Sequence, residues 1–412
     1  MVSLHSIVVS DPHTATALNE LADRLERLRA QPSFLCVFYD ANHDDREISA
    51  FFARRYPGVA MLGGSSCGGV MSEQGLGGKA SIGVLLVEDP AGDYGVSARR
   101  LSDKPAADAE QALYAALAQA GCPGELPELI WIYQAPGHEE QVLAGLRKVV
   151  GERCPILGGS SADNEVAGQW RQLGPDGPMD NGLVVGVLFS SGGISCAFQG
   201  GYEPAGPCGR VTGVSRHGSA AASDVPAGHA SRSTGRCIQS IDHQPAAEVY
   251  NRWNGGLVGD KLQGGNILVE TSMYPLGIDI GKIGDVTHYL IVHPDRILAD
   301  GALSTFADIE EGSTLFSMRG DKGHLIERAG KVAAAAAGAL PGGADSLAGG
   351  LVVYCAGCRI AVGEQMEGVS DAITRNFGGQ PFIGCFTFGQ QGQILNRNIH
   401  GNLMISAIAF GR

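Results

Sequence analysis

Two cysteines in the last quarter of the chain have a spacing that suits chemistry. Cys355 and Cys358 form a C-x-x-C motif between a predicted strand and a predicted helix. The free N–H groups at a helix N-terminus carry partial positive charge, which favours a thiolate and so suits redox chemistry or a soft metal. A structural zinc normally takes four ligands, and the chain has no second C-x-x-C. The alternative is that Cys355 is a buried strand residue and Cys358 an ordinary small residue.

A histidine and a third cysteine are further candidates. His400 begins the last predicted strand, two residues before Asn402. Histidine is the commonest haem or metal ligand, and an imidazole also hydrogen-bonds carboxylates. A metal site formed by His400, Cys355 and Cys358 therefore competes with a histidine that holds the strand start in place. Cys67 lies in a glycine-rich turn, but a nucleophile needs a base within reach and no local motif supplies one, so a small turn residue is favoured.

Charged and amide side chains near the same motifs suit a small ligand. Arg359 follows the C-x-x-C and would pair with a carboxylate through two parallel hydrogen bonds. Asp163 and Asn164 follow a second glycine turn and could hold an amine or a hydroxyl. The plainer alternatives are a surface salt bridge for Arg359 and side chains that close their own turn for Asp163 and Asn164.

A unit of strand, helix and glycine turn occurs three times in the sequence. Residues 37–69 and 132–164 each begin with an apolar strand, continue with a helical apolar pattern and contain the turn motif LGGSS. A more divergent third copy has its strand at 349–359 and its turn at 381–392. Parallel strands place their following loops on one rim of a sheet, where ligands bind in open α/β sheets. The glycines themselves are also explained by tight-turn geometry alone.

The repeats predict an α/β fold, with α+β as the alternative, in which duplicated strand–helix–strand units form two sheet domains. We expect a first domain at 1–201 with two related units and a second domain at 202–412. Within the second domain, residues 202–318 are predicted to be a β-rich middle segment and residues 319–412 the third α/β unit. The regions 10–100, 103–200 and 320–412 should superpose, with their glycine turns on one side.

Composition limits the classes of partner. The chain has 412 residues, with 30 Lys and Arg against 43 Asp and Glu, giving a net charge of −13. This charge disfavours nucleic acid and anionic membranes as partners. Neither a signal peptide nor a run of about 18 apolar residues is visible, so we expect a cytoplasmic protein whose ten cysteines are free thiols. The oligomeric state is left open, a homodimer included.

Taken together in their order and spacing, the motifs resemble the FIST family of bacterial sensory proteins, and the resemblance covers nearly the whole chain. The motifs that carry it are LGGSSCGGVMSEQG (62–75), ILGGSSADN (156–164), YPLGIDIG (274–281), DGALSTFADIEEGSTLFSMRG (300–320), YCAGCR (354–359), FTFGQQG (386–392) and HGN (400–402). Two departures stand out. Gly389-Gln390 replaces the family's usual Gly-Glu pair, and Cys358 is not a general family feature.

The resemblance implies sensing of a small ligand in signal transduction. Some FIST proteins bind haem, sense nitric oxide and act on a separately encoded histidine kinase, whereas others resemble amino-acid receptors. The ligand implied here is therefore an amino-acid-like anion, or haem with nitric oxide, and the signal would pass to a separate partner such as a histidine kinase. Any haem would be held non-covalently, because no C-x-x-C-H attachment motif occurs.

No complete catalytic constellation is visible, so we expect binding without catalysis. The alternative is a thiol- or metal-dependent enzyme that uses Cys355, Cys358 and His400. The residues predicted to line the ligand site are Gly63, Gly64, Ser65, Ser66, Cys67, Gly158, Gly159, Ser160, Ser161, Asp163, Asn164, Arg359, Phe388, Gly389 and Asn402.

Overall fold

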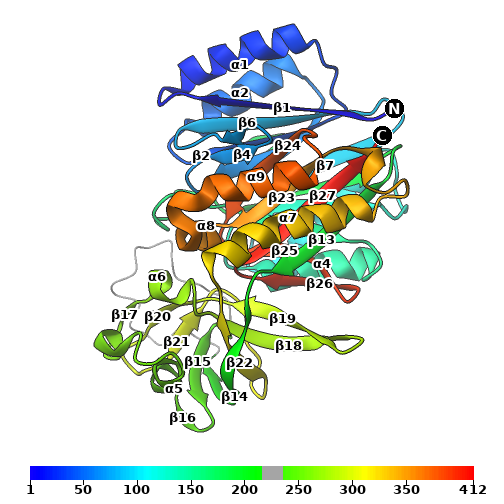
Figure 1. Ribbon diagram of the computed structural model, residues 1–412. Helices are drawn as coiled ribbons and strands as arrows, with labels where there is room; N and C mark the ends of the chain where they lie inside the picture. The colour runs from blue at the N-terminus through cyan, green and yellow to red at the C-terminus, as the bar shows by residue number, and fades with distance from the viewer. Residues whose placement is uncertain (216–234) are drawn as a thin grey trace.

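The computed structural model describes residues 1–215 and 235–412. Three α/β units pack together, and a β-rich middle domain lies at one end of them (Figure 1). The middle domain comprises residues 203–215 and 235–319. Residues 216–234, which belong to the segment predicted to be β-rich, lie outside the described residues. No helix of the described chain is long and apolar enough to cross a membrane.

The first unit packs two helices on the outer face of its sheet (Figure 1). Leu18, Leu21 and Leu25 recur at helical spacing and are buried against the sheet, as an amphipathic surface helix requires. The second helix is capped by Asp44, whose side chain accepts the N–H groups of two first-turn residues. The elements are β1 (Ser3–Ser10), α1 (Thr14–Leu28), β2 (Phe34–Asp40), α2 (Asp45–Arg55), β3 (Ala60–Ser66), β4 (Val70–Ser72), β5 (Gly75–Leu76) and β6 (Ser81–Glu88).

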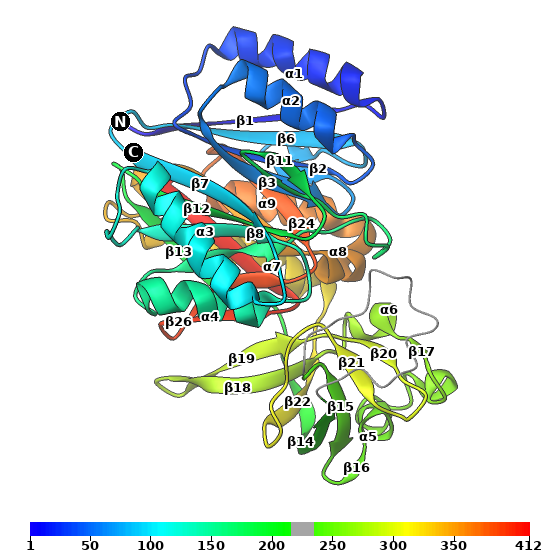
Figure 2. The same cartoon turned by 180° about the vertical axis from the view of Figure 1, so that it is seen from behind.

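The second unit repeats this order, with its helices outside its sheet (Figure 2). Its first helix begins with Pro105, whose fixed φ and missing N–H suit a first helical turn. The elements are β7 (Asp93–Arg100), α3 (Pro105–Gln119), β8 (Leu129–Gln134), α4 (Glu139–Val150), β9 (Ile156–Ser160), β10 (Gln172–Gly174), β11 (Gly177–Met179) and β12 (Gly182–Phe189).

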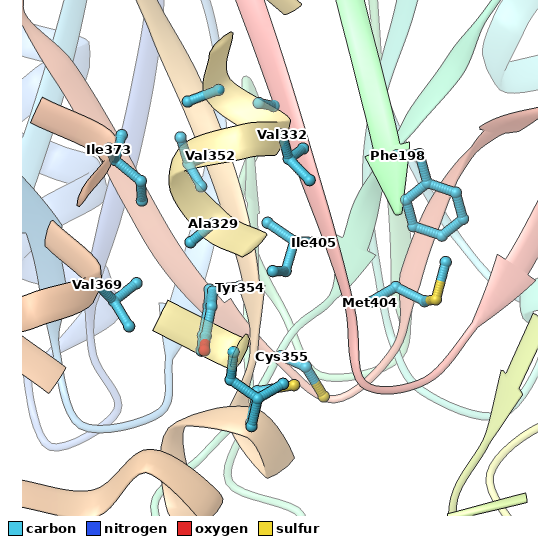
Figure 3. Packing of buried hydrophobic residues seen from close by; sticks show 14 of the residues in the cluster. Phe198, Ala329, Val332, Val352, Tyr354, Cys355, Val369, Ile373, Met404 and Ile405 are labelled. Carbon is cyan, nitrogen blue, oxygen red and sulfur yellow. The ribbon is translucent and has the colours of Figure 1, made fainter. Parts of the chain in front are cut away.

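The third unit is interrupted by the middle domain after its first strand. Its elements are β13 (Ile194–Gly200), α7 (Lys322–Gly338), the 3-10 helix η2 (Ala344–Ser346), β23 (Leu347–Cys355), α8 (Ala356–Val362), the 3-10 helix η3 (Gly363–Gln365), α9 (Met366–Asn376), β24 (Phe382–Thr387), β25 (Gln390–Ile394), β26 (Arg397–Gly401) and β27 (Met404–Gly411). In Figure 3, Ala329 and Val332 of α7 pack on Val352 of β23 and Ile405 of β27. This contact buries the apolar face of α7 against the third sheet.

The middle domain is built from a nine-stranded sheet with two short helices. Its elements are β14 (Glu203–Ser215), β15 (Cys237–Ile241), β16 (Gln244–Pro245), α5 (Ala246–Trp253), the 3-10 helix η1 (Gly259–Lys261), β17 (Gly265–Asn266), α6 (Leu268–Thr271), β18 (Leu276–Ile283), β19 (Val286–Val292), β20 (Pro294–Ile297), β21 (Leu303–Thr305) and β22 (Thr314–Arg319). The strands dominate, as the sequence predicts for this segment.

The three units exchange hairpins in a cycle. The first sheet has the order β1-β6-β2-β3-β10-β11, so its last two strands come from the second unit. The second sheet, β26-β25-β9-β8-β12-β7, takes its hairpin from the third unit, and the third sheet, β13-β27-β23-β24-β4-β5, takes its hairpin from the first. Each sheet is therefore completed by a neighbour.

The predicted mixed α/β class is confirmed, and the units occupy three sheets beside the fourth sheet of the middle domain. β13 belongs to the third sheet although it precedes residue 202. The proposed division of the chain at 201/202 stays a prediction.

Candidate functional site

The motifs predicted to be glycine turns are largely strands, since they lie in β3, β9 and β24, and the turns begin only after them. The ends of these strands meet at the centre of the molecule, where the units are related by a threefold pattern of hydrogen bonds. The backbone N–H of Cys67 donates to Phe386 O at 3.1 Å, that of Ala162 to Ser65 O at 3.2 Å, and that of Phe388 to Ser160 O at 3.0 Å. Cys67, Ala162 and Phe388 are thus equivalent positions, one from each unit. The sequence-predicted turns are brought together, as the repeat implies.

The first glycine of each LGGSS motif is required by strand packing. Gly63 pairs with Val37, and Gly158 pairs with Ile132, in the same parallel register. A Cβ at Gly63 would lie 1.7 Å from Val37 O, and one at Gly158 would lie 1.9 Å from Ile132 O. These close approaches account for both glycines, and direct ligand contact by them stays a prediction.

The serines of the two motifs hold the centre together. Ser66 Oγ accepts the N–H of Phe386 at 2.8 Å, and Ser65 Oγ accepts that of Arg171 at 2.8 Å. Ser160 Oγ donates to Glu139 at 2.6 Å. Since these hydroxyls are buried and already bonded within the protein, they contribute to stability whatever else they contact.

A polar group, which we call the first-turn cluster, surrounds the first glycine turn and consists of Asp40, Cys67, Asn164 and Arg359 together with the backbone of Gly68. Asn164 Oδ1 accepts the Gly68 N–H at 2.6 Å, and its Nδ2 donates to Asp40 Oδ1 at 3.1 Å. Arg359 Nη2 donates to Gly68 O at 3.2 Å. These contacts form a continuous path from a carboxylate to a guanidinium across one turn.

The geometry of the first-turn cluster leaves two charged side chains with unused atoms. Arg359 Nε and Asp40 Oδ2 are buried and have no hydrogen-bond partner among the described residues. The guanidinium carbon of Arg359 lies 5.1 Å from the centre of the Phe386 ring, a cation–π contact. The cluster nevertheless reaches the surface, because Asn164 is exposed and Arg359 is only half-buried.

Cys67 does not behave as an activated nucleophile. Burial raises its pKa to about 11, because the favourable charge of Arg359 is weaker than desolvation and the nearby Asp163 and Asp40 oppose it. Asp163 instead accepts backbone N–H groups of Glu165, Ala167 and Gln169 at 2.8–3.1 Å and so closes the turn that follows it. Both findings agree with the plainer alternatives considered from the sequence.

Cys355 and Cys358 form a second polar group next to the first-turn cluster. Burial alone would raise the pKa of Cys355, but hydrogen bonds from the Cys358 thiol and from the N–H groups of Cys358, Gly357 and Leu403 lower it to about 7. The pKa of Cys358 is raised by burial and by its contact with Cys355. The two thiols therefore differ in acidity, as in an asymmetric C-x-x-C.

The structure does not bring His400 into that thiol pair. His400 Nδ1 lies 2.8 Å from Glu140, in a network that also holds Glu139, Arg236 and Asp308 and that we call the Arg236 network. Arg236 comes from the middle domain, both glutamates from the start of α4, and His400 from β26. The network thus joins the middle domain to the second and third units.

Sequence reasoning missed Arg236, Glu139 and Glu140. Arg236 follows a glycine- and serine-rich stretch that also contains Arg232, so nothing in the sequence singles it out as the buried arginine. Only the two glutamates could have been noticed in the sequence. They begin α4, and the equivalent helix of the first unit, α2, also starts with two acidic residues, Asp44 and Asp45. Acidic residues at a helix N-terminus are common for electrostatic reasons, so this signal does not single out a site.

The surroundings of His400 do not fit a haem ligand. Its Nδ1 is bonded to Glu140, and its Nε2 lies against Gly389, where a Cβ would be only 2.5 Å away. Glu139, Glu140 and His400 are close enough together to hold a metal ion. However, Arg236 Nη2 already lies 2.8 Å from each carboxylate, so an ion-pair network describes these residues better.

The remaining predicted residues lie around the same centre. Phe388 packs its ring against Trp170, with ring centroids 6.0 Å apart. Asn402 Oδ1 lies 3.4 Å from the His293 N–H, and its Nδ2 has no partner among the described residues. Two surface hollows of about 730 and 500 Å³ lie elsewhere, along α1 and α2 and beside β1, and neither is lined by a predicted site residue.

Comparison with solved structures gives only distant likenesses. A cyanuric acid hydrolase from A. caulinodans is 12% identical, with a TM-score of 0.28, over 48% of this chain and 72% of its own. A second cyanuric acid hydrolase structure is 10% identical over the whole of both chains, with a TM-score of 0.36. T. maritima PurL complexed with ATP is 8% identical over 78% of this chain and 72% of its own, with a TM-score of 0.21. No curated protein matches the sequence.

Comparison with protein families gives a clear result. The FIST N domain matches residues 33–218, and the FIST C domain matches residues 246–393. Together these matches cover most of the chain and confirm the family predicted from its motifs. The protein belongs to the FIST family, whose domains are sensory domains of signal transduction.

Proposed function

We propose that this FIST protein is a cytoplasmic sensor that binds a small zwitterion, an α-amino acid, at the first-turn cluster and reports it to a separate partner such as a histidine kinase. The observation that carries the proposal is a pair of opposite charges with unused atoms. Arg359 Nε and Asp40 Oδ2 flank the Cys67–Gly68 turn, and neither has a partner in the described chain.

Unpaired polar atoms of this kind are costly when buried. A buried charged group without its hydrogen bonds loses hydration without compensation, and native structures rarely keep such groups without a purpose. An α-carboxylate would supply the missing acceptor for Arg359, and the α-ammonium would supply a donor for Asp40. A ligand with only one of these charges would satisfy one side of the cluster.

Entry to the site depends on Arg359. Its guanidinium lies over Gly68, where a Cβ would be 2.4 Å from Nη1, and glycine leaves room for it. The single bond to Gly68 O, at 3.2 Å, is long for a charge-assisted hydrogen bond. Movement of the guanidinium off Gly68 would expose the turn beside the already exposed Asn164.

A route for the signal starts at the same residue. Arg359 belongs to α8, which packs against α7 of the third unit and α6 of the middle domain. A ligand that repositions Arg359 would therefore act on a two-turn helix at the border of two bodies. Haem forms no part of the proposal, because His400 is enclosed by Glu140 and Gly389.

The test is calorimetric titration of the purified protein with each common L-amino acid and with the matching acid that lacks the amino group. We expect at least one amino acid to bind. Arg359→Ala should weaken it at least tenfold, since a hydrogen bond to a charged group contributes about 1.5–3 kcal/mol. Asp40→Asn should weaken the amino acid more than its deaminated analogue, because only the ammonium needs the carboxylate.

The matched control is Arg153→Ala, which removes an exposed arginine elsewhere on the second unit and should bind like the wild type. Circular dichroism establishes that each variant is folded. The proposal is rejected if no amino acid binds the wild type, or if binding survives unchanged in folded Arg359→Ala and Asp40→Asn. For the signalling step, autophosphorylation of a candidate histidine kinase is compared with and without the amino acid that binds.

A further inference from the structure

The C-x-x-C lies where the third unit meets the middle domain. Cys355 ends β23, and Cys358 is in the first turn of α8, so the two thiols come from one strand–helix corner. The Tyr202 hydroxyl lies 3.6 Å from Cys358 Sγ and donates to Ser272 O at 2.8 Å. Tyr202 stands between β13 and β14, where the chain leaves the third sheet for the middle domain.

We propose that Cys355 and Cys358 are a redox-active dithiol that exchanges with small-molecule disulfides and closes to an intramolecular disulfide. The geometry is that of two cysteines three residues apart across the start of a helix: Cys355 ends β23 and is the N-cap residue of α8, and Cys358 lies in the first turn of α8. C-x-x-C is the spacing of redox-active dithiols. Closure to a disulfide requires Cβ atoms that face each other about 3.5–4.5 Å apart.

The chemistry begins at Cys355. Cys355 is the N-cap residue of α8, so its thiol stands at a helix N-terminus, where, despite burial, the Cys358 thiol and the nearby N–H groups lower its pKa to about 7 and favour the thiolate. The thiolate attacks one sulfur of a disulfide RS–SR, forming a mixed disulfide and releasing RS⁻. Cys358 then loses its proton to the released RS⁻, and its sulfur attacks Cys355 Sγ, releasing the second RS⁻. The second RS⁻ takes up a proton equivalent to the one that Cys355 released on forming its thiolate, so the two protein thiols are together oxidised by two electrons and RS–SR is reduced to two RSH.

The surroundings match this division of roles. Burial keeps the pKa of Cys358 high, so Cys358 stays a thiol until the mixed disulfide forms. The Tyr354 hydroxyl is buried without a partner among the described residues, and Figure 3 shows Tyr354 beside Cys355 at the end of β23. Both sulfurs are buried, so α8 must open for the exchange. This helix has only two turns, ends at Gly363 with φ +62°, and exposes Ile360 to solvent.

Closure of the disulfide would change a contact between α8 and the middle domain. It bonds the Cys358 sulfur to Cys355 at the end of β23 and so draws it away from Tyr202. Tyr202 is tied to Ser272, the residue after α6. The redox state of the dithiol would therefore alter the contact between α8 and the middle domain, independently of any amino acid at the first-turn cluster.

The experiment uses the full chain, reduced and then incubated with oxidised glutathione. Remaining thiols are blocked with N-ethylmaleimide, and peptides are mapped by mass spectrometry. We expect a Cys355–Cys358 disulfide in the wild type and one glutathione on Cys355 in Cys358→Ser. Cys355→Ser should leave Cys358 unmodified. Cys385→Ser removes a buried cysteine whose pKa is strongly raised by burial and should react like the wild type.

The pH dependence separates a tuned thiol from an ordinary one. In Cys358→Ser, a serine hydroxyl can still donate to Cys355, so glutathione addition should rise through about pH 7, well below the roughly 8.5 of a free cysteine. Three outcomes would overturn the proposal: a wild type in which Cys355 and Cys358 both remain reduced, glutathione on Cys358 in Cys355→Ser, or a link between Cys67 and Cys355. The wild-type mapping needs no variant and no amino acid, so its result does not depend on the proposed function.

Discussion

Two arginines of this protein occupy opposite situations. The Arg236 side chain is 6% exposed, and it pairs with Glu139 and Glu140 at 2.8 Å and with Asp308 at 3.1 Å. Arg359 is half-buried and donates to a carbonyl at 3.2 Å, and its Nε has no partner among the described residues. Arg236 has its carboxylate partners within the protein, whereas Arg359 would gain a hydrogen bond from a ligand.

This difference separates a structural charge from a binding charge. A buried arginine surrounded by carboxylates is held by desolvated ion pairs, and removing it leaves those carboxylates uncompensated. An arginine that rests on an aromatic ring and a backbone oxygen can move at small cost. The number of satisfied donors is therefore more informative than burial or charge alone.

The largest expected effect is on Arg236. Arg236→Ala should lower the free energy of unfolding by about 3–5 kcal/mol, because it strands the buried Glu139 carboxylate. Urea denaturation followed by circular dichroism measures this. Arg236→Lys keeps one charge but loses the planar set of donors, and we expect an intermediate loss. A change below about 1 kcal/mol for Arg236→Ala would show that the Arg236 network does not hold the domains together.

The second prediction concerns pH and His400. Burial opposes its charge, but Glu140 and Glu139 outweigh burial and raise its pKa. A raised folded-state pKa contributes stability below the unfolded value of about 6.5, and that stability is lost as pH rises through the folded value. His400→Gln should therefore cost about 1.5–3 kcal/mol at pH 6 and clearly less at pH 9.

The comparison is made by urea denaturation of both proteins at each pH. Asp308, whose pKa burial raises to about 6, titrates in wild type and variant alike, so it largely cancels in the difference. The lowered pKa values of Glu139 and Glu140 keep both carboxylates ionised throughout. A cost that grows from pH 6 to pH 9 would contradict a charged His400.

The smallest expected effect is the loss of Arg359. Arg359→Ala removes one long hydrogen bond and a cation–π contact, together worth no more than about 1 kcal/mol at a partly exposed site. We expect the midpoint of thermal unfolding of this variant, measured without ligand, to be close to that of the wild type. A loss of unfolding free energy as large as that of Arg236→Ala would show that Arg359 is a structural residue, like Arg236.

The repeated units could be predicted because their sequences keep the same physical requirement. Gly63 and Gly158 stand in identical LGGSS motifs since each faces a carbonyl oxygen that leaves no room for a Cβ. The third unit has lost that motif. Its apolar run at 349–359 still located most of β23, whereas 381–392 was predicted to be a turn and contains the strand β24. Periodicity and turn chemistry are local, and a single sequence displays them directly.

The exchanged hairpins and the Arg236 network were not predictable in the same way. The short strands β4, β10 and β25 carry no pattern that says which sheet they join. Arg236 pairs with Glu139 and Glu140, which lie almost a hundred residues earlier in the chain, so its role cannot be inferred from its neighbours in the sequence. Contacts of this kind are set by tertiary packing, which overrides local preference.

The cyclic exchange of hairpins also determines how long some strands wait for their partners while the chain is being synthesised. β4 pairs with β24, and the N–H of Phe382 donates to Glu73, 309 residues earlier in the chain. At about 5–20 residues per second, a ribosome needs roughly 15–60 s to make that stretch. The hairpin of the first unit must wait for that time with unpaired edges, which are the places where chains join wrongly. We therefore expect chaperones to protect the nascent chain until its last strands have been synthesised.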